Sequence, residues 1–340
     1  MVLVEPGAGD GSGFADEEYA RAGARLVDVE EVWSAPELVV KVKAPNPLEV
    51  ERLRAGQTLF AYLHLAPDRR LTEKLLAAEV QAIAYETIQL SDGTFPVLAP
   101  MSEVAGRLAI QIGVTLLQRD RGGKGLLIGG VPGVPRGCVT VIGAGIVGIN
   151  AVRVAHALGA EVTVLDVDSR RLTYLYDLFH GELSTVYSNP SNLGRAVAAS
   201  DLLVGAVYLR GRRAPRLVTE KMVASMQAGS VIADVAVDQG GCIETIRPTT
   251  HSSPTYVVHE VIHYGVANMP AVVPRTSSFA LTNVTLPYIE RMAESGVEAA
   301  VRADPGLALG VNTWRGSLVC EEVAAEHALP HCALDALFAS

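Results

Sequence analysis

A glycine pattern in the middle of the chain constrains the fold more than any other feature of the sequence. Residues 139–148 read VTVIGAGIVG, an apolar strand-like run that continues through three spaced glycines into a helix-like run. A strand that ends in GxGxxG and leads into a helix is typical of a dinucleotide-binding βαβ unit. In such a unit we expect Gly143 to form the tight turn, Gly145 to let the backbone approach a pyrophosphate, and Gly148 to let the helix pack closely on the strand.

The acidic residue after this unit indicates which dinucleotide fits. Asp166 ends the next apolar run, VTVLD, eighteen residues after Gly148. A carboxylate at this position accepts a hydrogen bond from the ribose 2′-hydroxyl and repels a 2′-phosphate, so the sequence predicts NAD rather than NADP. Arg170 and Arg171 follow within one turn and keep NADP open as an alternative. An α/β turn with a chance glycine pattern and no nucleotide is a second alternative.

The order of the apolar runs predicts an α/β fold. Helix-like stretches separate strand-like runs rich in Val, Ile and Leu, which is typical of a parallel sheet covered on both faces. These runs are 139–142, 162–165, 202–207 and 231–236. Strand-like and helix-like runs also alternate over the first hundred residues, with a strand predicted over 38–43. We expect a linking helix over 102–117, an irregular loop over 122–133, and helices from residue 275 onward.

Composition and charge exclude several classes of protein. A length of 340 residues allows two domains. The formal charge of −9 argues against nucleic acid as a partner. The four cysteines form no CxxC pair, which is typical of a reducing compartment. Because we find neither an apolar run long enough for a membrane helix nor a signal-peptide pattern, we expect a soluble, cytoplasmic protein.

One motif in the sequence suggests a metal site. His259-Glu260-Val261-Ile262-His263 matches HExxH, which on a helix places two imidazoles on one face to bind zinc. The run before it, residues 255–258, is strand-like. We therefore expect these polar residues to close a strand and a loop, and we predict no metal site.

Two polar residues follow apolar strand-like runs. His64 follows LFAYL, and Asp238 follows VIADVAV. Strand ends of this kind commonly present side chains to a cleft in α/β enzymes. An imidazole titrates near neutrality and can act as a general acid or base. From the residues alone, a catalytic and a structural role remain open for both.

Several stretches taken together resemble the alanine dehydrogenase family. In chain order they are GAGDGSGF, VVKVKAPNP, LFAYLHLA, IAYETIQ, VLAPMSEVAGRLA, GGVPGV, VIGAGIVG, VLDVD, DVAVDQGGC, RPTTHSSPTY, VANMPAVVP and SSFALTN. The resemblance implies reversible, NAD-dependent oxidative deamination of L-alanine to pyruvate and ammonia by a homo-oligomer, usually a hexamer. It also implies two Rossmann-like domains, with an NAD-binding domain (97–274) inserted into a split catalytic domain (1–96 and 275–340).

The resemblance also implies roles for individual residues. Lys43 matches a ligand of the substrate carboxylate, and His64 matches the general acid/base. Asp238 matches a residue that works with this histidine and contacts the nicotinamide ribose. Further positions match the cofactor pocket, namely Ser102, Asp166, Arg171, Ser188, Val266, Asn268 and Met269.

The sequence departs from the family pattern at its start. The family begins with a strand and a loop that carries a substrate-binding arginine, and this chain starts after them, so we expect an N-terminally truncated catalytic domain. An arginine donates two parallel hydrogen bonds to a carboxylate, which one lysine cannot reproduce. A normal enzyme read from a wrong start, a weak enzyme and a non-catalytic NAD-binding homologue therefore remain open. A related NAD(P) enzyme with another substrate, or one coupled to transhydrogenation, is a further alternative.

Overall fold

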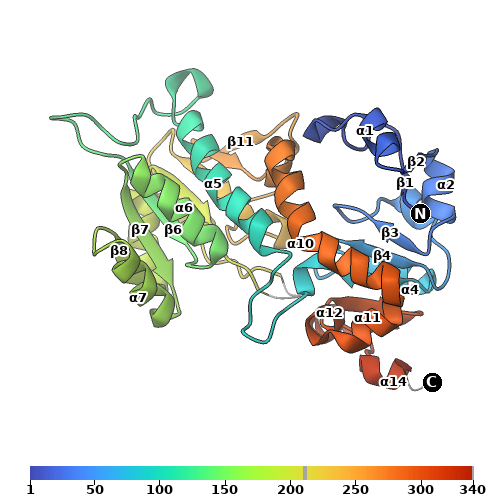
Figure 1. The fold of residues 1–340 in the computed structure, drawn as a ribbon. Coiled ribbons are helices and arrows are strands. Elements are labelled where there is room, and N and C mark those ends of the chain that lie inside the picture. Colours follow the sequence, from blue (N-terminus) through green and yellow to red (C-terminus); the bar gives the residue numbers. More distant parts are fainter. Residues whose placement is uncertain (210–212, 339–340) are drawn as a thin grey trace. The chain divides into compact units, whose positions relative to one another are not determined.

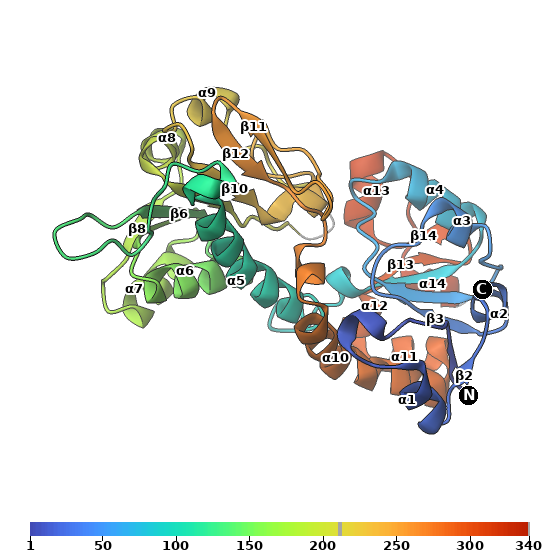
Figure 2. The same ribbon diagram turned by 90° about the horizontal axis from the view of Figure 1, so that it is seen from above.

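The computed structural model describes residues 1–209 and 213–338, which divide into two compact units (Figures 1 and 2). Unit 1 contains residues 1–101 and 273–338, and unit 2 contains Ser102–Leu209 and Arg213–Val272. The chain leaves unit 1 within helix α5 (Ala99–Leu116) and returns just before helix α10 (Pro274–Ser295).

Unit 2 is built on a seven-stranded sheet with the order β11-β12-β10-β9-β6-β7-β8. All neighbours are parallel except β11 and β12, which form an antiparallel hairpin. The strands are β6 (Cys138–Ile142), β7 (Glu161–Asp166), β8 (Ser184–Tyr187), β9 (Leu202–Gly205), β10 (Val231–Asp234), β11 (Thr255–Val258) and β12 (Val261–Tyr264). The predicted α/β class is confirmed, and each of the four strand-like runs of this region contains a strand. The runs predicted over 202–207 and 231–236 end as strands at Gly205 and Asp234.

Helices cover both faces of this sheet. Figure 2 shows α5, α6 and α7 on one face and α8 and α9 on the other. Their bounds are α6 (Ile146–Ala157), α7 (Ser169–Leu178), α8 (Pro190–Ala199) and α9 (Glu220–Val223). Burial on both faces explains why β6, β9 and β10 are continuous apolar runs instead of alternating ones.

Unit 1 contains a five-stranded sheet with the order β14-β13-β5-β4-β3 and a separate two-stranded parallel sheet of β1 and β2. The strands are β1 (Leu3–Val4), β2 (Arg25–Leu26), β3 (Leu38–Val40), β4 (Thr58–Ala61), β5 (Gln81–Ala84), β13 (Val311–Trp314) and β14 (Ser317–Leu318). The helices are α1 (Asp16–Arg21), α2 (Val29–Ser34), α3 (Pro47–Val50), α4 (Arg69–Ala77), α10, α11 (Val297–Ala303), α12 (Pro305–Ala308), α13 (Glu321–His327) and α14 (Leu334–Phe338). β3 forms one edge of the five-stranded sheet.

Two predictions for unit 1 are wrong in detail. The chain beyond residue 275 is not helical throughout, because β13 and β14 form a hairpin there and β13 pairs with β5. The hairpin turns at Arg315 and Gly316, whose φ angles are +46° and +81°, as a tight two-residue turn requires. The strand predicted over 38–43 ends at Val40, so Lys43 lies beyond it.

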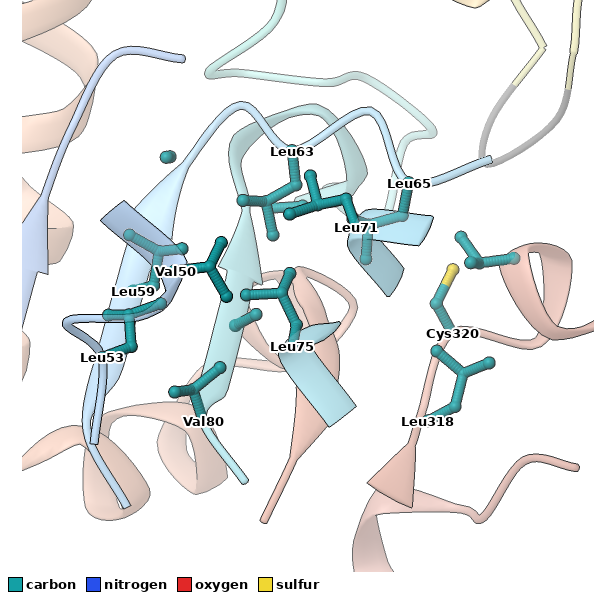
Figure 3. Close-up of a cluster of buried hydrophobic side chains, with 14 of the residues drawn as sticks. Val50, Leu53, Leu59, Leu63, Leu65, Leu71, Leu75, Val80, Leu318 and Cys320 are labelled. Atoms are coloured by element: carbon teal, nitrogen blue, oxygen red, sulfur yellow. The ribbon is translucent and has the colours of Figure 1, made fainter. Parts of the chain in front are cut away.

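The residues of β4 and the turn after it alternate between two cores. Leu59 and Leu63 point into a cluster with α3, α4 and the segment around Leu318 (Figure 3), whereas Phe60 and Tyr62 join a second cluster with residues of α10–α12. Successive side chains of a strand point to opposite faces, so both faces of this part of the sheet are buried. Leu63, which is 1% exposed, fixes the chain immediately before His64.

The sequence has no apolar run long enough for a membrane helix, and the helices of the structure can be compared with this expectation. Among the described residues, no helix combines the length and the hydropathy needed to cross a membrane.

Candidate active site

His64 lies in a turn just beyond β4, on left-handed backbone with φ +49°. The N–H groups of Leu63 and His64 donate to the carboxylate of Glu86, at 3.2 and 2.6 Å. Glu86 is 3% exposed and lies in the 3-10 turn that follows β5, the neighbour of β4. Non-glycine residues rarely adopt this backbone conformation. The hydrogen bonds to Glu86 stabilise it and thereby hold the backbone that carries the imidazole.

Glu86 was missed as a site residue in the sequence. It lies in the family block IAYETIQ, directly after the apolar run that becomes β5. The carboxyl ends of parallel neighbours meet at one edge of a sheet, and an acid immediately after β5 therefore comes close to the end of β4. That rule was the available signal.

Lys43 and His64 are neighbours in unit 1. The distance from Lys43 Nζ to His64 Nε2 is 3.2 Å, and both side chains are half-buried. An ammonium group has only donors, so Nε2 accepts and the proton of the neutral imidazole lies on Nδ1. The structure thus brings together the two side chains for which the resemblance implies binding of the substrate carboxylate and proton transfer.

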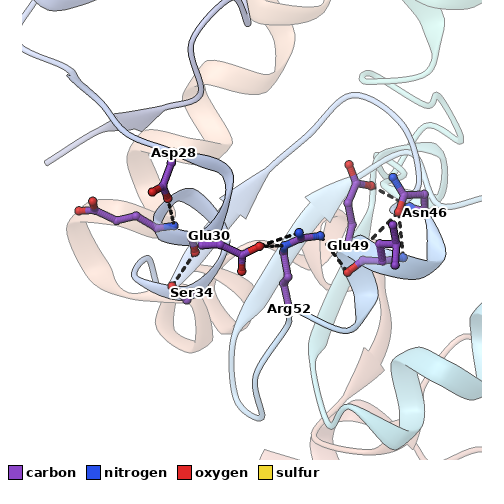
Figure 4. Close-up of polar contacts among 8 residues, drawn as sticks. Asp28, Glu30, Ser34, Asn46, Glu49 and Arg52 are labelled. Atoms are coloured by element: carbon purple, nitrogen blue, oxygen red, sulfur yellow. Dashed lines mark hydrogen bonds and ion pairs between the residues drawn. The ribbon is translucent and has the colours of Figure 1, made fainter.

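Helix α3, which begins four residues after Lys43, has polar contacts at both of its ends (Figure 4). Asn46 accepts from backbone N–H groups of the first turn of α3, while Glu49 accepts from the Asn46 N–H at 2.7 Å. This capping box satisfies donors that the start of a helix leaves open. Arg52, just beyond α3, donates from Nε and Nη2 to Glu30 of α2 at 2.8 and 2.6 Å, which ties the two helices together.

The glycine loop of unit 2 leaves room where a phosphate would lie. A Cβ on Gly145 would meet nothing within 4 Å, whereas a Cβ on Gly143 would lie 2.5 Å from the Ala206 carbonyl oxygen. A Cβ on Gly148 would overlap the Gly143 carbonyl oxygen. Gly145 is the N-cap of α6 and has no side chain that could cap the helix. The N–H groups and the positive dipole end of a helix N-terminus without a side-chain cap suit a pyrophosphate.

Asp166 ends β7 and is 7% exposed. Its Oδ2 accepts from the Ala144 N–H at 2.6 Å, which joins this strand end to the glycine loop. The Asp168 N–H donates to Oδ1 at 2.8 Å, and Arg171 Nη1 lies 3.8 Å from Oδ2. Arg170 hydrogen-bonds Asp168 and thereby lowers the pKa of that carboxyl.

The remaining predicted residues of unit 2 follow strands or begin α5. Ser188 follows β8, and its N–H donates to the Asp166 carbonyl oxygen at 2.9 Å. Val266 and Met269 follow β12 and are 1% and 3% exposed. Ser102 lies half-buried in the first turns of α5.

Asp238 lies in the 3-10 turn Val235–Gln239 that follows β10, and its side chain is half-buried. Its carboxylate accepts from the Asn268 N–H at 3.2 and 3.3 Å. Asn268 has a φ of +58°, so a left-handed residue presents this donor. Unit 2 therefore brings Asp238 and Asn268 together, and it joins Asp166 to the glycine loop.

The HExxH sequence has the strand-and-turn conformation that we expect for it. His259 and Glu260 form the two-residue turn between β11 and β12, with φ angles of +51° and +59°. His263 lies buried in β12 and contacts Thr245 Oγ1, whereas His259 contacts Glu220. The two imidazoles have different partners and do not share a helix face. Within residues 1–209 and 213–338, no group of three or more His, Cys, Asp or Glu side chains could hold a metal ion.

Comparisons with known proteins match nearly the whole chain. The family model described as alanine dehydrogenase/PNT, N-terminal domain, matches residues 1–105, and the model of the C-terminal domain matches 109–321. The alanine dehydrogenase of Methanococcus maripaludis is 52% identical over 332 residues, which cover 97% of this chain and 89% of the relative. The alanine dehydrogenase of Mycobacterium tuberculosis is 50% identical over 330 residues, with the same coverage.

Solved structures agree with this result. A structure of L-alanine dehydrogenase superimposes with a TM-score of 0.88 at 48% identity, covering 96% of this chain and 91% of that chain. A transhydrogenase from Sinorhizobium meliloti superimposes with a TM-score of 0.77 at 25% identity, covering 94% and 91%. The chain belongs to the alanine dehydrogenase family.

Proposed function

We propose that this protein is an NAD-dependent alanine dehydrogenase, which converts L-alanine, NAD⁺ and water reversibly into pyruvate, ammonium, NADH and a proton. The observation that carries the proposal is the contact between Lys43 Nζ and His64 Nε2 in a chain of this family. A cation beside a neutral imidazole suits a small substrate with a carboxylate at one end and a proton-transfer centre next to it.

Lys43 binds the substrate carboxylate and thereby fixes the Cα of alanine. The carboxylate replaces His64 Nε2 as the acceptor of the ammonium, which leaves this nitrogen available for proton transfer. The bound nicotinamide supplies the hydride acceptor. Loss of a proton from the ammonium group of alanine to solvent and of a hydride from Cα leaves the protonated imine of pyruvate. His64 then takes a proton from the water that attacks the imine carbon and returns it to the nitrogen as ammonia leaves.

For Asp238 we propose a contact with the nicotinamide ribose and a role in the same reaction as His64. Its position after a central parallel strand supports this role, because ligands of doubly wound folds bind at the carboxyl ends of the strands. The hydrogen bond from the Asn268 N–H to Asp238 holds this carboxylate in one orientation.

For the cofactor we propose NAD, bound by unit 2 as a domain inserted between the two parts of a split catalytic domain. Gly143, Gly145 and Gly148 would hold the pyrophosphate, and Asp166 would accept from the ribose 2′-hydroxyl. Arg170 lies beside the carboxylate of Asp168, and Arg171 lies beside that of Asp166. These carboxylates partly neutralise the positive charges that could bind the 2′-phosphate of NADP, which supports NAD. The pocket would also include Ser102, Ser188, Val266, Asn268 and Met269.

The resemblance further leads us to propose a homohexamer located in the cytoplasm.

The test is an assay of NADH formation by the purified chain. We expect the wild type to form NADH only when both L-alanine and NAD are present. Lys43→Ala and His64→Ala should form no NADH but should still bind it. NADH binding without alanine turnover would favour a non-catalytic homologue. Hydride exchange between NADH and NADP in the absence of alanine would favour transhydrogenation. Either result would refute the proposal.

A further inference from the structure

A buried carboxylate lies beneath the loop that carries Asp238. Asp234, the last residue of β10, is 0% exposed. Its Oδ1 accepts from the Ala236 N–H at 2.9 Å, and its Oδ2 accepts from the N–H groups of Cys242 and Ile243 at 2.8 and 3.3 Å. The Cys242 thiol lies 3.7 Å from Oδ1.

These contacts connect both ends of one loop, residues 235–243, which we call the Asp238 loop. Within it, the Gly240 N–H donates to the Val237 carbonyl and the Gly241 N–H to the Ala236 carbonyl, both at 2.9 Å. The two glycines have φ angles of +91° and +77°, which lets the chain turn back toward Asp234. The loop therefore closes around the carboxylate of Asp234.

The adjacent strand leaves space for this carboxylate. Gly205 ends β9, and a Cβ at this position would lie 2.7 Å from Asp234 Oδ1 and 2.7 Å from Cys242 Sγ. On Gly241, a Cβ would lie 2.9 Å from Asp234 Oδ2. The backbone packs against Asp234 from two sides, so its orientation is fixed.

Burial of a carboxylate is unfavourable, and here the hydrogen bonds only partly offset it. Desolvation raises the pKa of Asp234 to about 6, although backbone N–H groups lower it. The Asp238 loop thus retains an unfavourable buried group where a neutral side chain would avoid that cost.

We propose that Asp234 is a positioning residue that holds the Asp238 loop so that the Asp238 carboxylate meets the Asn268 N–H and acts in turnover. This inference rests on the proposed role of Asp238. Asp234 itself does not touch substrate or cofactor in this scheme. It acts through the loop, whose ends it connects.

The first test is a double-mutant cycle on the full chain with Asp234→Asn, Asp238→Asn and the double variant. Asparagine keeps the shape but turns an N–H donor toward the backbone donors of the loop. We expect Asp234→Asn to lower kcat by about 10- to 100-fold, in the range for a displaced reacting group. In the Asp238→Asn background the same substitution should change kcat less than about twofold, because its effect passes through Asp238. Equal losses in both backgrounds would overturn the inference.

A control separates positioning from loss of stability. Val231→Ala shortens a buried side chain at the start of β10, four residues before the Asp238 loop, and should lower the melting temperature. We expect it to keep wild-type kcat at a temperature where it is folded. If its kcat falls as far as that of Asp234→Asn at equal melting temperature, Asp234 has no positioning role. Should Asp234→Asn not fold, Gly205→Ala takes its place in the cycle, because the new Cβ displaces the carboxylate without removing it.

A readout without turnover keeps this inference distinct from the proposed function. We expect hydrogen exchange at the Asn268 amide to become faster in Asp234→Asn and in Asp238→Asn, but not in Val231→Ala. Unchanged exchange in Asp234→Asn would overturn the positioning role even if the wild type oxidises alanine. A wild type that fails to oxidise alanine but shows the expected exchange pattern would refute the proposed function and leave the loop contact intact.

Discussion

A buried carboxylate holds both the turn that carries His64 and the loop that carries Asp238, but the two arrangements differ. Each begins just beyond a buried parallel strand, and in each a buried carboxylate accepts hydrogen bonds from backbone N–H groups. At His64 the unusual φ angle falls on the functional residue itself, and the carboxylate comes from Glu86 beyond the neighbouring strand. In the Asp238 loop, Gly240 and Gly241 adopt the positive φ angles, and the carboxylate comes from the same strand.

This difference shows how strongly each site depends on distant parts of the chain. The brace of the His64 turn depends on the pairing of β4 with β5, because Glu86 is 22 residues away in sequence. The Asp238 loop can close locally, since Asp234 and Cys242 are eight residues apart. We therefore expect the His64 turn to respond more strongly to changes elsewhere in its unit.

The largest expected effect comes from removal of the His64 imidazole. We expect His64→Ala to lower kcat by about 10²- to 10⁴-fold, the range for loss of a general acid/base. NADH affinity should stay nearly unchanged, because the glycine loop and Asp166 belong to the other unit. In contrast, Asp238→Asn should reduce both kcat and NADH affinity. Steady-state kinetics and NADH titration measure this split.

His180→Ala is the matched control for this prediction. His180 also has a left-handed φ, +52°, but lies exposed beyond α7. It should keep full activity. Retention of turnover by His64→Ala would remove this imidazole from the mechanism.

The next effect concerns the brace of the His64 turn. Glu86→Gln replaces one acceptor oxygen with an N–H₂ group that faces backbone donors, and a buried donor without an acceptor costs about 1–3 kcal/mol. We expect a fall in kcat of about 10- to 100-fold and a lower melting temperature. The exposed Glu79→Gln, on left-handed backbone after α4, should change neither. Wild-type kcat in Glu86→Gln would show that the imidazole does not need this brace.

Sequence patterns identify the parts of these sites that depend on short-range order. Short patterns predict the strands, the turn and the helix of unit 2, because each pattern lies within the element that it predicts or directly beside it. These patterns are the GxGxxG spacing, Asp166 and the four apolar runs. His64 and Asp238 are recognisable as polar residues just after apolar runs. Their roles in catalysis are still predictions.

The contacts that hold these residues were not predictable in the same way. Glu86 reaches His64 across a strand pair, and its place directly after an apolar run points to His64 only once the pairing of β4 with β5 is known. Asp234 reads as the last residue of a strand, so its carboxylate contacts depend on the return of the Asp238 loop. The hairpin of β13 and β14 was missed because strands of two to four residues give a weak periodic signal among helices.

Asp166 extends the comparison to a third strand end, where the bracing carboxylate would itself contact a ligand. Its hydrogen bond to the Ala144 N–H holds the glycine loop, and the proposed second contact is with the ribose 2′-hydroxyl. We expect Asp166→Asn to weaken NADH binding about tenfold, the value of one charge-assisted hydrogen bond, and to weaken NADPH binding less. Asp168→Asn is the control, since its carboxylate pairs with Arg170. Equal loss of NADH and NADPH affinity would mean that Asp166 only braces the loop.

The smallest expected effect is the pH dependence that Asp234 adds to stability. Burial raises its pKa from 3.8 to about 6, so the folded protein binds this proton more tightly than the unfolded chain does. The stabilising contribution of this proton is fully present below about pH 3.8 and is lost as the pH rises through 6. Between pH 5 and 6 the loss amounts to about 1 kcal/mol. Urea unfolding of wild type and Asp234→Asn isolates this group, because other carboxyls titrate alike in both. The free energy of unfolding of the wild type should fall relative to that of the variant across this interval. A constant difference would show that Asp234 is ionised throughout, and the loop would then be held by a full negative charge at all these pH values.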